Sequence, residues 1–190
     1  YRELVRHCLS DATHEFGVVL IDRGHEVGGG DIRRQVGTVA RLVQVAELSG
    51  DRYAVIAVGV RRIRVTGWLA DDPYPLAEVS DWPDEDEPDD PDLPIGQLLL
   101  RVTEHVRRSA ALAIELGDVT GDPTIELSDE LVASSYQLAA MAPLGGADVF
   151  DLLSAPGPRR RLQLMAQRLD DVDAMHRFRL AAEGQPPDAP

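Results

Sequence analysis

Apolar residues in the first half of the chain form short runs that are rich in valine and isoleucine, between residues 35 and 82. These runs are separated by a Ser-Gly-Asp turn at residues 49–51 and by an Asp-Pro-Tyr-Pro stretch at residues 72–75. β-branched residues favour strands, whereas Gly, Asp and Pro mark turns. Runs at residues 39–45 and 54–58 have apolar side chains on both faces, as in strands curled into a small barrel. The pattern predicts an antiparallel meander.

A short helix and one strand are predicted ahead of this meander. The helix is indicated by apolar residues that recur at helical spacing, namely Tyr1, Leu4, Val5, Cys8 and Leu9. Residues 16–21 then form a continuous apolar run that predicts a buried strand. Residues 22–31 contain three consecutive glycines, but the Gly-Lys-Ser/Thr ending of a phosphate-binding loop is missing. We interpret this stretch as a mobile loop.

The composition changes abruptly after residue 82, where Asp, Glu and Pro replace the apolar runs. Like charges and prolines exclude regular structure, so residues 83–94 are predicted to be an extended, solvated linker between two units. Carboxylates in this number could gather a cation such as calcium, but the spacing and glycine of an EF-hand are absent. We therefore expect no metal here.

The chain after this linker is predicted to be helical from residue 95 to 182, with a frayed tail at residues 183–190. The first helix follows an apolar stripe and ends at Gly117. The second is expected to begin at Ser128, whose hydroxyl can cap free amides, and to stop at Pro143. A short helix at residues 147–153 and a last helix from Pro158 complete this half.

Charge and composition narrow the classes of partner. The formal net charge of -14 argues against nucleic acid and anionic membrane surfaces, because modules for such partners carry a basic field. The single cysteine cannot form an internal disulfide, and no apolar run is long enough to span a bilayer. We expect a cytoplasmic protein whose partners are other proteins.

No catalytic, cofactor or metal site is predicted. All 19 basic residues other than histidine are arginines, so neither the lysine of a P-loop nor that of a Ser-Lys dyad can be present. The histidines lack the spacing of zinc ligands. Cys8 follows His7, which could activate a thiol, but its place on the apolar stripe favours a buried structural residue.

Several spaced motifs resemble the N-terminal, substrate-binding domain of Lon proteases. They are Gly-Thr-Val-Ala at 37–40, Gly-x-x-Arg-x-x-Val at 59–65, Pro-Tyr-x-x-Ala-x-Val at 73–79, and Leu-Leu at 152–153 followed by Arg-Leu at 161–162. The resemblance implies an α+β fold: a small antiparallel PUA-like β-barrel over residues 1–82 and then a helical bundle. In the family, a strand and a short segment that ends in Tyr precede the first helix, and Tyr1 matches that Tyr. The resemblance therefore implies that the first strand is missing from these residues and that a neighbouring strand has an unpaired edge.

The resemblance also implies a function, which is to hold protein segments without catalysis. We expect a stand-alone bacterial member without ATPase and protease domains that binds polypeptide clients as an adaptor or regulator in protein quality control. Arginine without lysine likewise suggests a bacterial genome of high GC content. Exposed strand edges could take an extended peptide. Candidate contacts are two arginines on one strand face and three aromatics at strand ends, namely Arg62, Arg64, Trp68, Tyr74 and Trp82.

Each of these candidates also has a purely structural interpretation. The arginines could be a solvated outer face, and the aromatics could pack in the core. A PUA-like RNA-binding module is the alternative function, which the acidic charge disfavours. An enzymatic role ranks last, because no catalytic set can be assembled from the residues.

Overall fold

The computed structural model describes residues 1–23 and 32–183 of the 190-residue chain. It divides into two compact units, residues 1–83 and residues 84–190. The expected glycine-rich loop and most of the expected tail lie outside the described residues.

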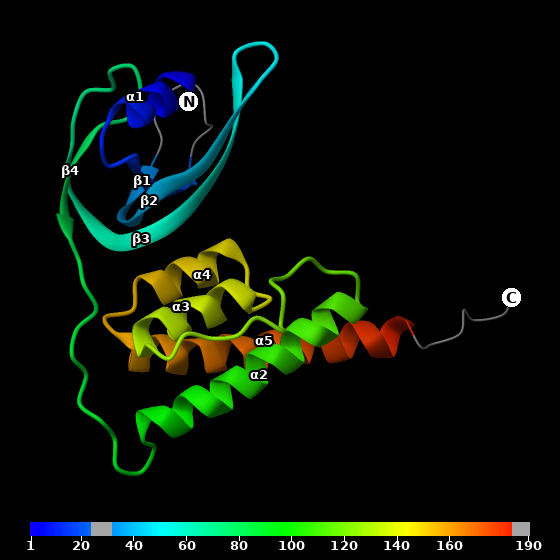
Figure 1. Ribbon diagram of the computed structural model, residues 1–190. Coiled ribbons are helices and arrows are strands. Elements are labelled where there is room, and N and C mark those ends of the chain that lie inside the picture. The colour runs from blue at the N-terminus through cyan, green and yellow to red at the C-terminus, as the bar shows by residue number, and fades with distance from the viewer. Residues whose placement is uncertain (24–31, 184–190) are drawn as a thin grey trace, which may run out of the picture. The chain divides into compact units, whose positions relative to one another are not determined.

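The first unit is an antiparallel sheet with one helix (Figure 1). Its elements are α1 (Arg2–Ser10), β1 (Glu15–Arg23), β2 (Ile32–Leu48), β3 (Arg52–Trp68) and β4 (Ala77–Asp81). The strands lie in the order β1-β2-β3-β4, so each pairs with its neighbour in sequence. The predicted meander is therefore confirmed.

The strands β2 and β3 form a long hairpin of 17 residues on each side. Its turn contains Gly50 at φ 78° and Asp51 at φ 58°, which is the left-handed region that Gly and Asp tolerate best. Register shifts interrupt the pairing after Val39 and after Leu42. Such bulges increase the local twist of a hairpin, which explains why the sheet curls.

The sheet is not a closed barrel, and this part of the prediction is wrong. β1 and β4 are the two ends of the strand order and are not neighbours within the described part of the sheet. Closure requires every strand to have two neighbours. Four strands, one of which is only five residues long, leave the inner face of the curled sheet partly uncovered. The α+β class itself is confirmed.

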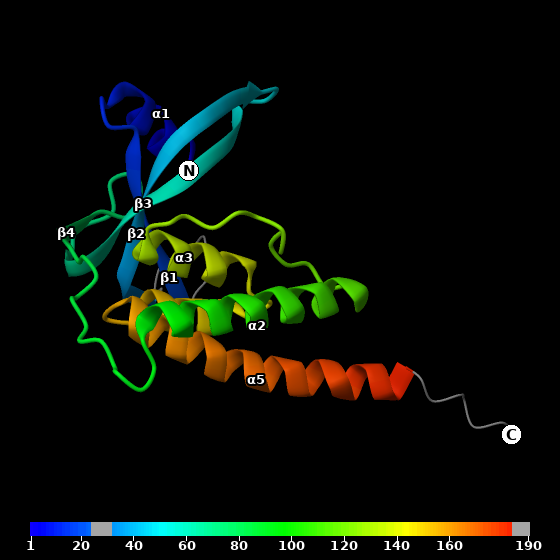
Figure 2. The same ribbon diagram turned by 60° about the horizontal axis from the view of Figure 1, so that its bottom comes forward.

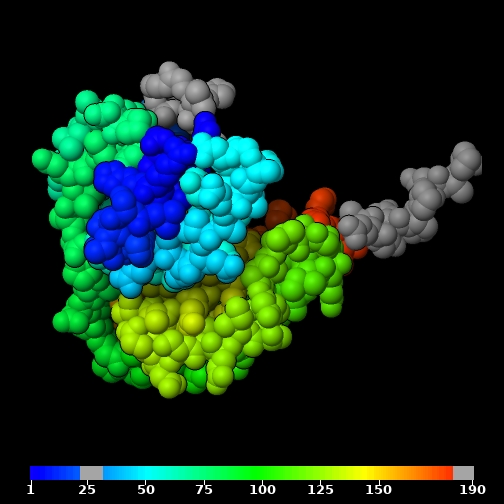
Figure 3. All heavy atoms as spheres, turned by 45° about the horizontal axis from the view of Figure 1, so that its top comes forward, coloured from blue at the N-terminus to red at the C-terminus, as the bar shows by residue number. Residues whose placement is uncertain are grey.

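Helix α1 packs on the sheet through the apolar stripe expected from its sequence. Val5 and Cys8 are buried, whereas Arg2 and Arg6 both donate to the carboxylate of Asp51 in the hairpin turn. The space-filling view shows α1 in blue lying against the cyan hairpin (Figure 3). Burial of Cys8 agrees with its interpretation as a structural residue.

The second unit is a bundle of helices with its own apolar core. Its elements are α2 (Ile95–Glu115), α3 (Leu131–Met141), α4 (Gly146–Leu153) and α5 (Pro158–Glu183). The two long helices α2 and α5 run side by side in the same direction (Figure 2). All four helices supply fully buried apolar side chains to the core, among them Val106, Leu138, Leu152, Leu162 and Met165.

The predicted start of α3 is off by two residues. The N-cap is Glu130, whose carboxylate accepts hydrogen bonds from the backbone N–H groups of Val132 and Ala133. Ser128 instead accepts from the backbone N–H of Glu130. A carboxylate at this position satisfies free amides and also favours the positive end of the helix dipole.

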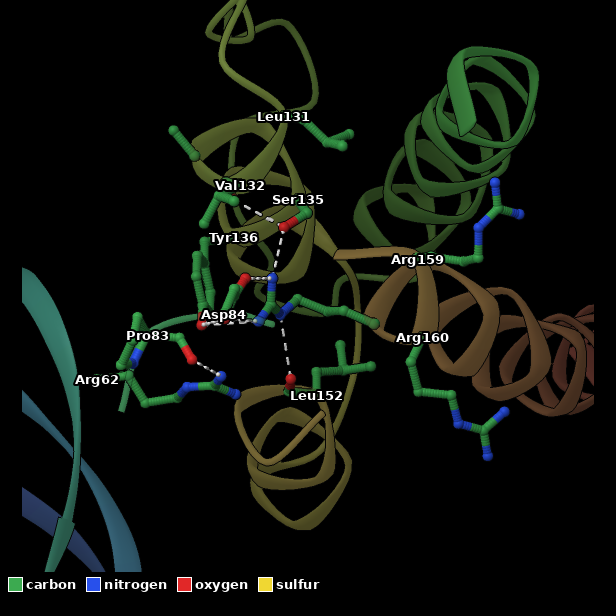
Figure 4. Close-up of polar contacts among 12 residues, drawn as sticks. Arg62, Pro83, Asp84, Leu131, Val132, Ser135, Tyr136, Leu152, Arg159 and Arg160 are labelled. Atoms are coloured by element: carbon green, nitrogen blue, oxygen red, sulfur yellow. Dashed lines mark hydrogen bonds and ion pairs between the residues drawn. The ribbon is translucent and has the colours of Figure 1, made fainter. Parts of the chain in front are cut away.

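The acidic segment after residue 83 is only in part the solvated charge run that we expected, because Asp84, Glu87 and Asp89 have partners in the helical unit. Asp84 accepts from both terminal nitrogens of Arg161, at 2.8 and 2.9 Å, and Arg161 is fully buried. The same guanidinium donates to Ser135 Oγ, Tyr136 Oη and the carbonyl of Leu152. Figure 4 labels these three acceptors together with Asp84. A buried arginine requires such partners for its charge.

Two further carboxylates of this segment hold the start of α5. Glu87 accepts from the backbone N–H groups of Arg159 and Arg160, and Asp89 pairs with the Arg159 side chain. Glu87 therefore caps the N-terminus of α5, although it is far from this helix in sequence. Its carboxylate accepts from backbone N–H groups that have no partner within the helix. Residues 84–94 are thereby fastened to the helical unit by hydrogen bonds and ion pairs.

Candidate functional site

A cavity of about 490 Å³ lies on the inner face of the curled sheet. We call it the slot. Its floor is formed by Val39 of β2 and by Ile63 and Val65 of β3, all of which are buried. The other walls come from α1, β1, β4 and the Tyr74–Leu76 stretch that leads into β4. The slot thus lies where a closed barrel would have its interior.

The alternation of side chains along the strands decides which residues face the slot. Gly17 pairs with Val39, and Gly37 pairs with Ile63, so these positions share the inner face. A Cβ on Gly37 would lie 2.5 Å from the carbonyl oxygen of Val18, which is too close for any other residue. A Cβ on Gly17 would lie 3.7 Å from Ile63 Cδ1, an ordinary contact. Gly37 is needed for strand approach, whereas Gly17 leaves room in the slot.

The edge of β1 is part of the slot wall. Five consecutive residues, 15–19, line the cavity, although side chains of only every second residue can point to one face. Consecutive lining means that the cavity also meets the backbone of the strand. β1 therefore offers main-chain groups as well as side chains to the slot.

Two charged side chains that line the slot, Glu15 and Arg33, are held in ion pairs. Glu15 accepts from Arg61 and from Arg41, and these hydrogen bonds hold the pKa of its carboxyl below the usual value. Arg33 pairs with Asp71 and lies over the ring of Trp68 at 4.9 Å from its centroid. Pairing leaves the apolar floor as the main feature that a ligand would meet.

Polar side chains of α1 lie at the same cavity. Burial raises the pKa of the Cys8 thiol, with a further contribution from the nearby Asp11 carboxylate. The thiol donates to the carbonyl of Glu15 at 3.5 Å. Tyr74 Oη lies 2.5 Å from His7 Nδ1, and burial raises the pKa of the Tyr74 hydroxyl. A protonated, hydrogen-bonded thiol is a poor nucleophile, so this arrangement favours structure over chemistry.

The five candidate contact residues fall into two groups. Trp68 and Tyr74 line the slot, and Trp68 is 38% exposed. Arg62, Arg64 and Trp82 lie together on the other face of the sheet: both guanidinium carbons are about 4 Å from the centroid of the Trp82 ring. The structure thus brings each group together but separates the two.

Arg62 is buried rather than solvated. Its exposed fraction is 7%, and it donates to the carbonyls of Trp82 and Pro83. Its charge is therefore used to anchor the chain after β4 and to stack on Trp82. Arg64 is exposed on the same face. The expectation of a wholly solvated face is wrong for Arg62.

Sequence reasoning named strand edges as a component of a site but missed the floor. Val39, Ile63 and Val65 have the same pattern as any core residue, so the sequence gives no sign that the space above them is open. The unpaired edge was anticipated only through the resemblance. The paired charges Glu15, Arg41 and Arg61 come from three strands, and only the register brings them together.

No group of three His, Cys, Asp or Glu side chains within residues 1–23 and 32–183 is placed to hold a metal ion. None of the helices in this described part is long and apolar enough to cross a membrane.

Comparison with known proteins identifies the relatives of this chain. Residues 1–171 match the family model of the ATP-dependent protease La (LON) substrate-binding domain. A Lon N-terminal domain protein from Xanthomonas campestris has 26% identity and a TM-score of 0.58, and the match covers 87% of this chain and 82% of that one. No curated protein matches the chain.

A second solved structure supports the fold alone. The N-terminal domain of a Lon protease from the Mycobacterium avium complex has 18% identity and a TM-score of 0.55, over 88% of this chain and 83% of that one. The family model covers most of the chain, and both solved domains are similar to it in fold. The chain therefore belongs to the family of LON substrate-binding domains.

Proposed function

We propose that this protein is a non-catalytic polypeptide-binding module that serves as an adaptor or regulator in protein quality control. The observation that carries the proposal is the slot: an apolar cavity that adjoins a strand edge. Apolar floors bind side chains, and strand edges bind main chains, so a site with both suits unfolded segments.

Membership of the family supports the same conclusion. LON substrate-binding domains bind substrates of a protease, and substrates of a protease are polypeptides. The chain contains no lysine, so the nucleotide-binding and Ser-Lys chemistry of Lon must be supplied by other residues than these 190. Binding is the part of that activity which these residues can perform.

The charge of the protein predicts which clients bind best. A net charge of -14 attracts basic segments at a distance and repels acidic ones, and salt weakens both effects. The apolar floor is not screened by salt. We therefore expect basic, apolar-rich unfolded segments to associate faster than acidic segments of equal hydrophobicity.

The proposal is tested by fluorescence anisotropy with one labelled client in two states. A reduced and alkylated, permanently unfolded polypeptide should bind saturably, and the same polypeptide in its folded state should not. A labelled single-stranded RNA of similar length serves as the comparison. Polypeptide binding that tolerates moderate salt supports the proposal.

Two results would contradict it. If the unfolded polypeptide does not bind at high-micromolar protein, the module does not hold clients by itself. If RNA binds instead, with affinity that falls steeply as salt rises, the protein is a nucleic-acid module despite its charge.

A further inference from the structure

We propose that an apolar patch near the C-terminal end of α5 binds the same patch of a second copy of this protein. The two α5 helices would pack antiparallel about a two-fold axis. This inference goes beyond the proposed function and does not depend on the slot, because the patch lies wholly within the helical unit.

The patch lies on the side of α5 that faces away from the other helices. Leu169 and His176 are buried in the bundle, whereas Phe178 is 77% exposed and Met175 is 51% exposed. Phe178 follows Leu169 by about two and a half turns, so the two side chains lie on opposite sides of the helix. The end of α5, in red, also continues beyond the end of α2 (Figure 2). The bundle therefore leaves Phe178 uncovered.

Small residues lie beside this aromatic ring. Ala174 and Ala181 are exposed and lie one turn before and one turn after Phe178 on the same side of α5. Alanines on a helix surface let a second helix approach closely. Phe178 of each copy can then pack over Ala174 of the other, so the patch is complementary to itself. We call the set Ala174, Met175, Phe178 and Ala181 the α5 patch.

The charges beside the α5 patch indicate how two copies would be oriented. Asp170 and Asp171 precede it and are exposed, and Arg177 lies within it, with 70% of its side chain exposed. Parallel helices would place like charges side by side, whereas antiparallel helices place the aspartates of one copy beside the arginine of the other. Arg177 lies 3.6 Å from Asp173 of its own helix, and the five N–H donors of a guanidinium can also serve a second carboxylate.

A two-fold axis beside Met175 satisfies the apolar and the charged contacts together. Residue 175 − n of one copy then faces residue 175 + n of the other. Ala174 comes within about 3 Å, along the helix axis, of Phe178 in the second copy, and Asp171 comes equally near to Arg177. Symmetry forms each of these contacts twice.

The family offers no other partner for this surface. Its model matches residues 1–171, and the α5 patch begins at residue 174. The partner is therefore inferred from the residues themselves, and a surface that is complementary to itself in shape and in charge fits a second copy.

Sedimentation velocity of the whole protein measures the association. One helix pair buries less than the roughly 1,200 Å² of a standard interface, so we expect a weak dimer that forms at about 100 µM and dissociates at about 1 µM. Phe178→Glu should raise the Kd about tenfold or more. Leu100→Glu is the matched control, because Leu100 is 68% exposed on α2, and it should leave the Kd unchanged. Circular dichroism checks that both variants keep their helices.

A charge exchange tests the antiparallel arrangement. Asp171→Arg alone and Arg177→Asp alone place like charges across the two-fold axis, so each variant should associate about tenfold more weakly than the wild type. An equal mixture of the two variants should regain the association, because every mixed dimer has an arginine beside an aspartate at both contacts. Restoration by mixing cannot arise from a loss of folding.

A cross-link gives a second measure of the same geometry. Met175→Cys should form a covalent dimer under mild oxidation, because the two-fold axis brings residue 175 of both copies together. Leu100→Cys should not form one. The natural cysteine, Cys8, is buried.

Three results would overturn the inference. They are a wild-type protein that stays monomeric at about 100 µM, an association that Phe178→Glu and Leu100→Glu affect equally, and charge variants that associate no better when mixed. None of them bears on client binding, so the proposed function is decided separately by the anisotropy measurement.

Discussion

At the scale of single residues, Arg161 shows how one buried charge can organise its surroundings. Its side chain is fully buried. It donates to the Asp84 carboxylate, to the hydroxyls of Ser135 and Tyr136, and to the carbonyl of Leu152. Tyr136 both accepts from Arg161 and donates to Asp84, so the network closes on itself. Removing the arginine would leave several buried polar groups without their donor.

Arg161→Met should lower the free energy of unfolding of the helical unit by about 3–5 kcal/mol, because it leaves the Asp84 carboxylate buried without its partner. Urea denaturation followed by far-ultraviolet circular dichroism measures the change. The matched control is Arg160→Met, the exposed neighbour on α5, with an expected change within about 0.5 kcal/mol. Equal losses in the two variants would show that the network is not stabilising.

At the scale of elements, α2 and α5 are joined by a polar seam as well as by the core. Asp173 of α5 is 4% exposed and accepts from Ser109 and from His105 of α2, with Arg108 and Arg177 nearby. Burial alone would raise the pKa of the Asp173 carboxyl, but the hydrogen bonds from Ser109 and His105 lower it overall. The ionised form is therefore favoured by folding.

This seam predicts a difference between wild type and Asp173→Asn that depends on pH. Because the folded-state pKa is lowered, the ionised carboxylate stabilises the fold above its unfolded pKa, near 4, and less as pH falls through the folded value. The variant should be less stable by about 1.5–3 kcal/mol at pH 7, and the difference should shrink below about pH 4.

Urea denaturation at several pH values measures this difference. Asp170→Asn is the control, because Asp170 lies one turn away on α5 but its side chain is 78% exposed. A gap between wild type and Asp173→Asn that stays constant from pH 7 to pH 3 would contradict the role assigned to the charge.

At the scale of the whole molecule, the two units differ in how fully their apolar interiors are filled. The helical unit has a continuous apolar core and includes the acidic segment, whose carboxylates bond to α5. The sheet unit keeps an open slot on its inner face. The proposed binding site thus belongs to the sheet unit, whereas the continuous apolar core belongs to the helical unit.

A comparison of two fragments tests this assignment. Residues 84–183 should unfold cooperatively on heating, because they contain the core, the partner of Arg161 and the cap of α5. Residues 95–183 lack Asp84, Glu87 and Asp89 and should be less stable by roughly 3–5 kcal/mol. Circular dichroism melting curves measure the stability of the two fragments. Identical curves would show that residues 84–94 are a linker that does not stabilise the helical unit.

Much of the local structure could be predicted from the sequence because it depends on neighbours along the chain. The meander, the turn at Gly50 and Asp51, the helix that buries Cys8 and the end of α2 near Gly117 all follow from residue type and periodicity. The N-cap of α3 was misplaced because Ser is a preferred N-cap residue and Glu is not, so residue type favoured Ser128, and only the geometry shows that Glu130 caps the helix.

The sequence by itself determined the α+β class, the family and the lack of lysine chemistry, because motifs, periodicity and composition are properties of the chain order. Only the tertiary structure decided that the sheet stays open, that Asp84 lies against a buried Arg161, and that Arg62 is not solvated. These features depend on register and on contacts between residues far apart in sequence. A run of aspartates has the same sequence signature in water as beside a buried arginine, and only the folded chain distinguishes the two.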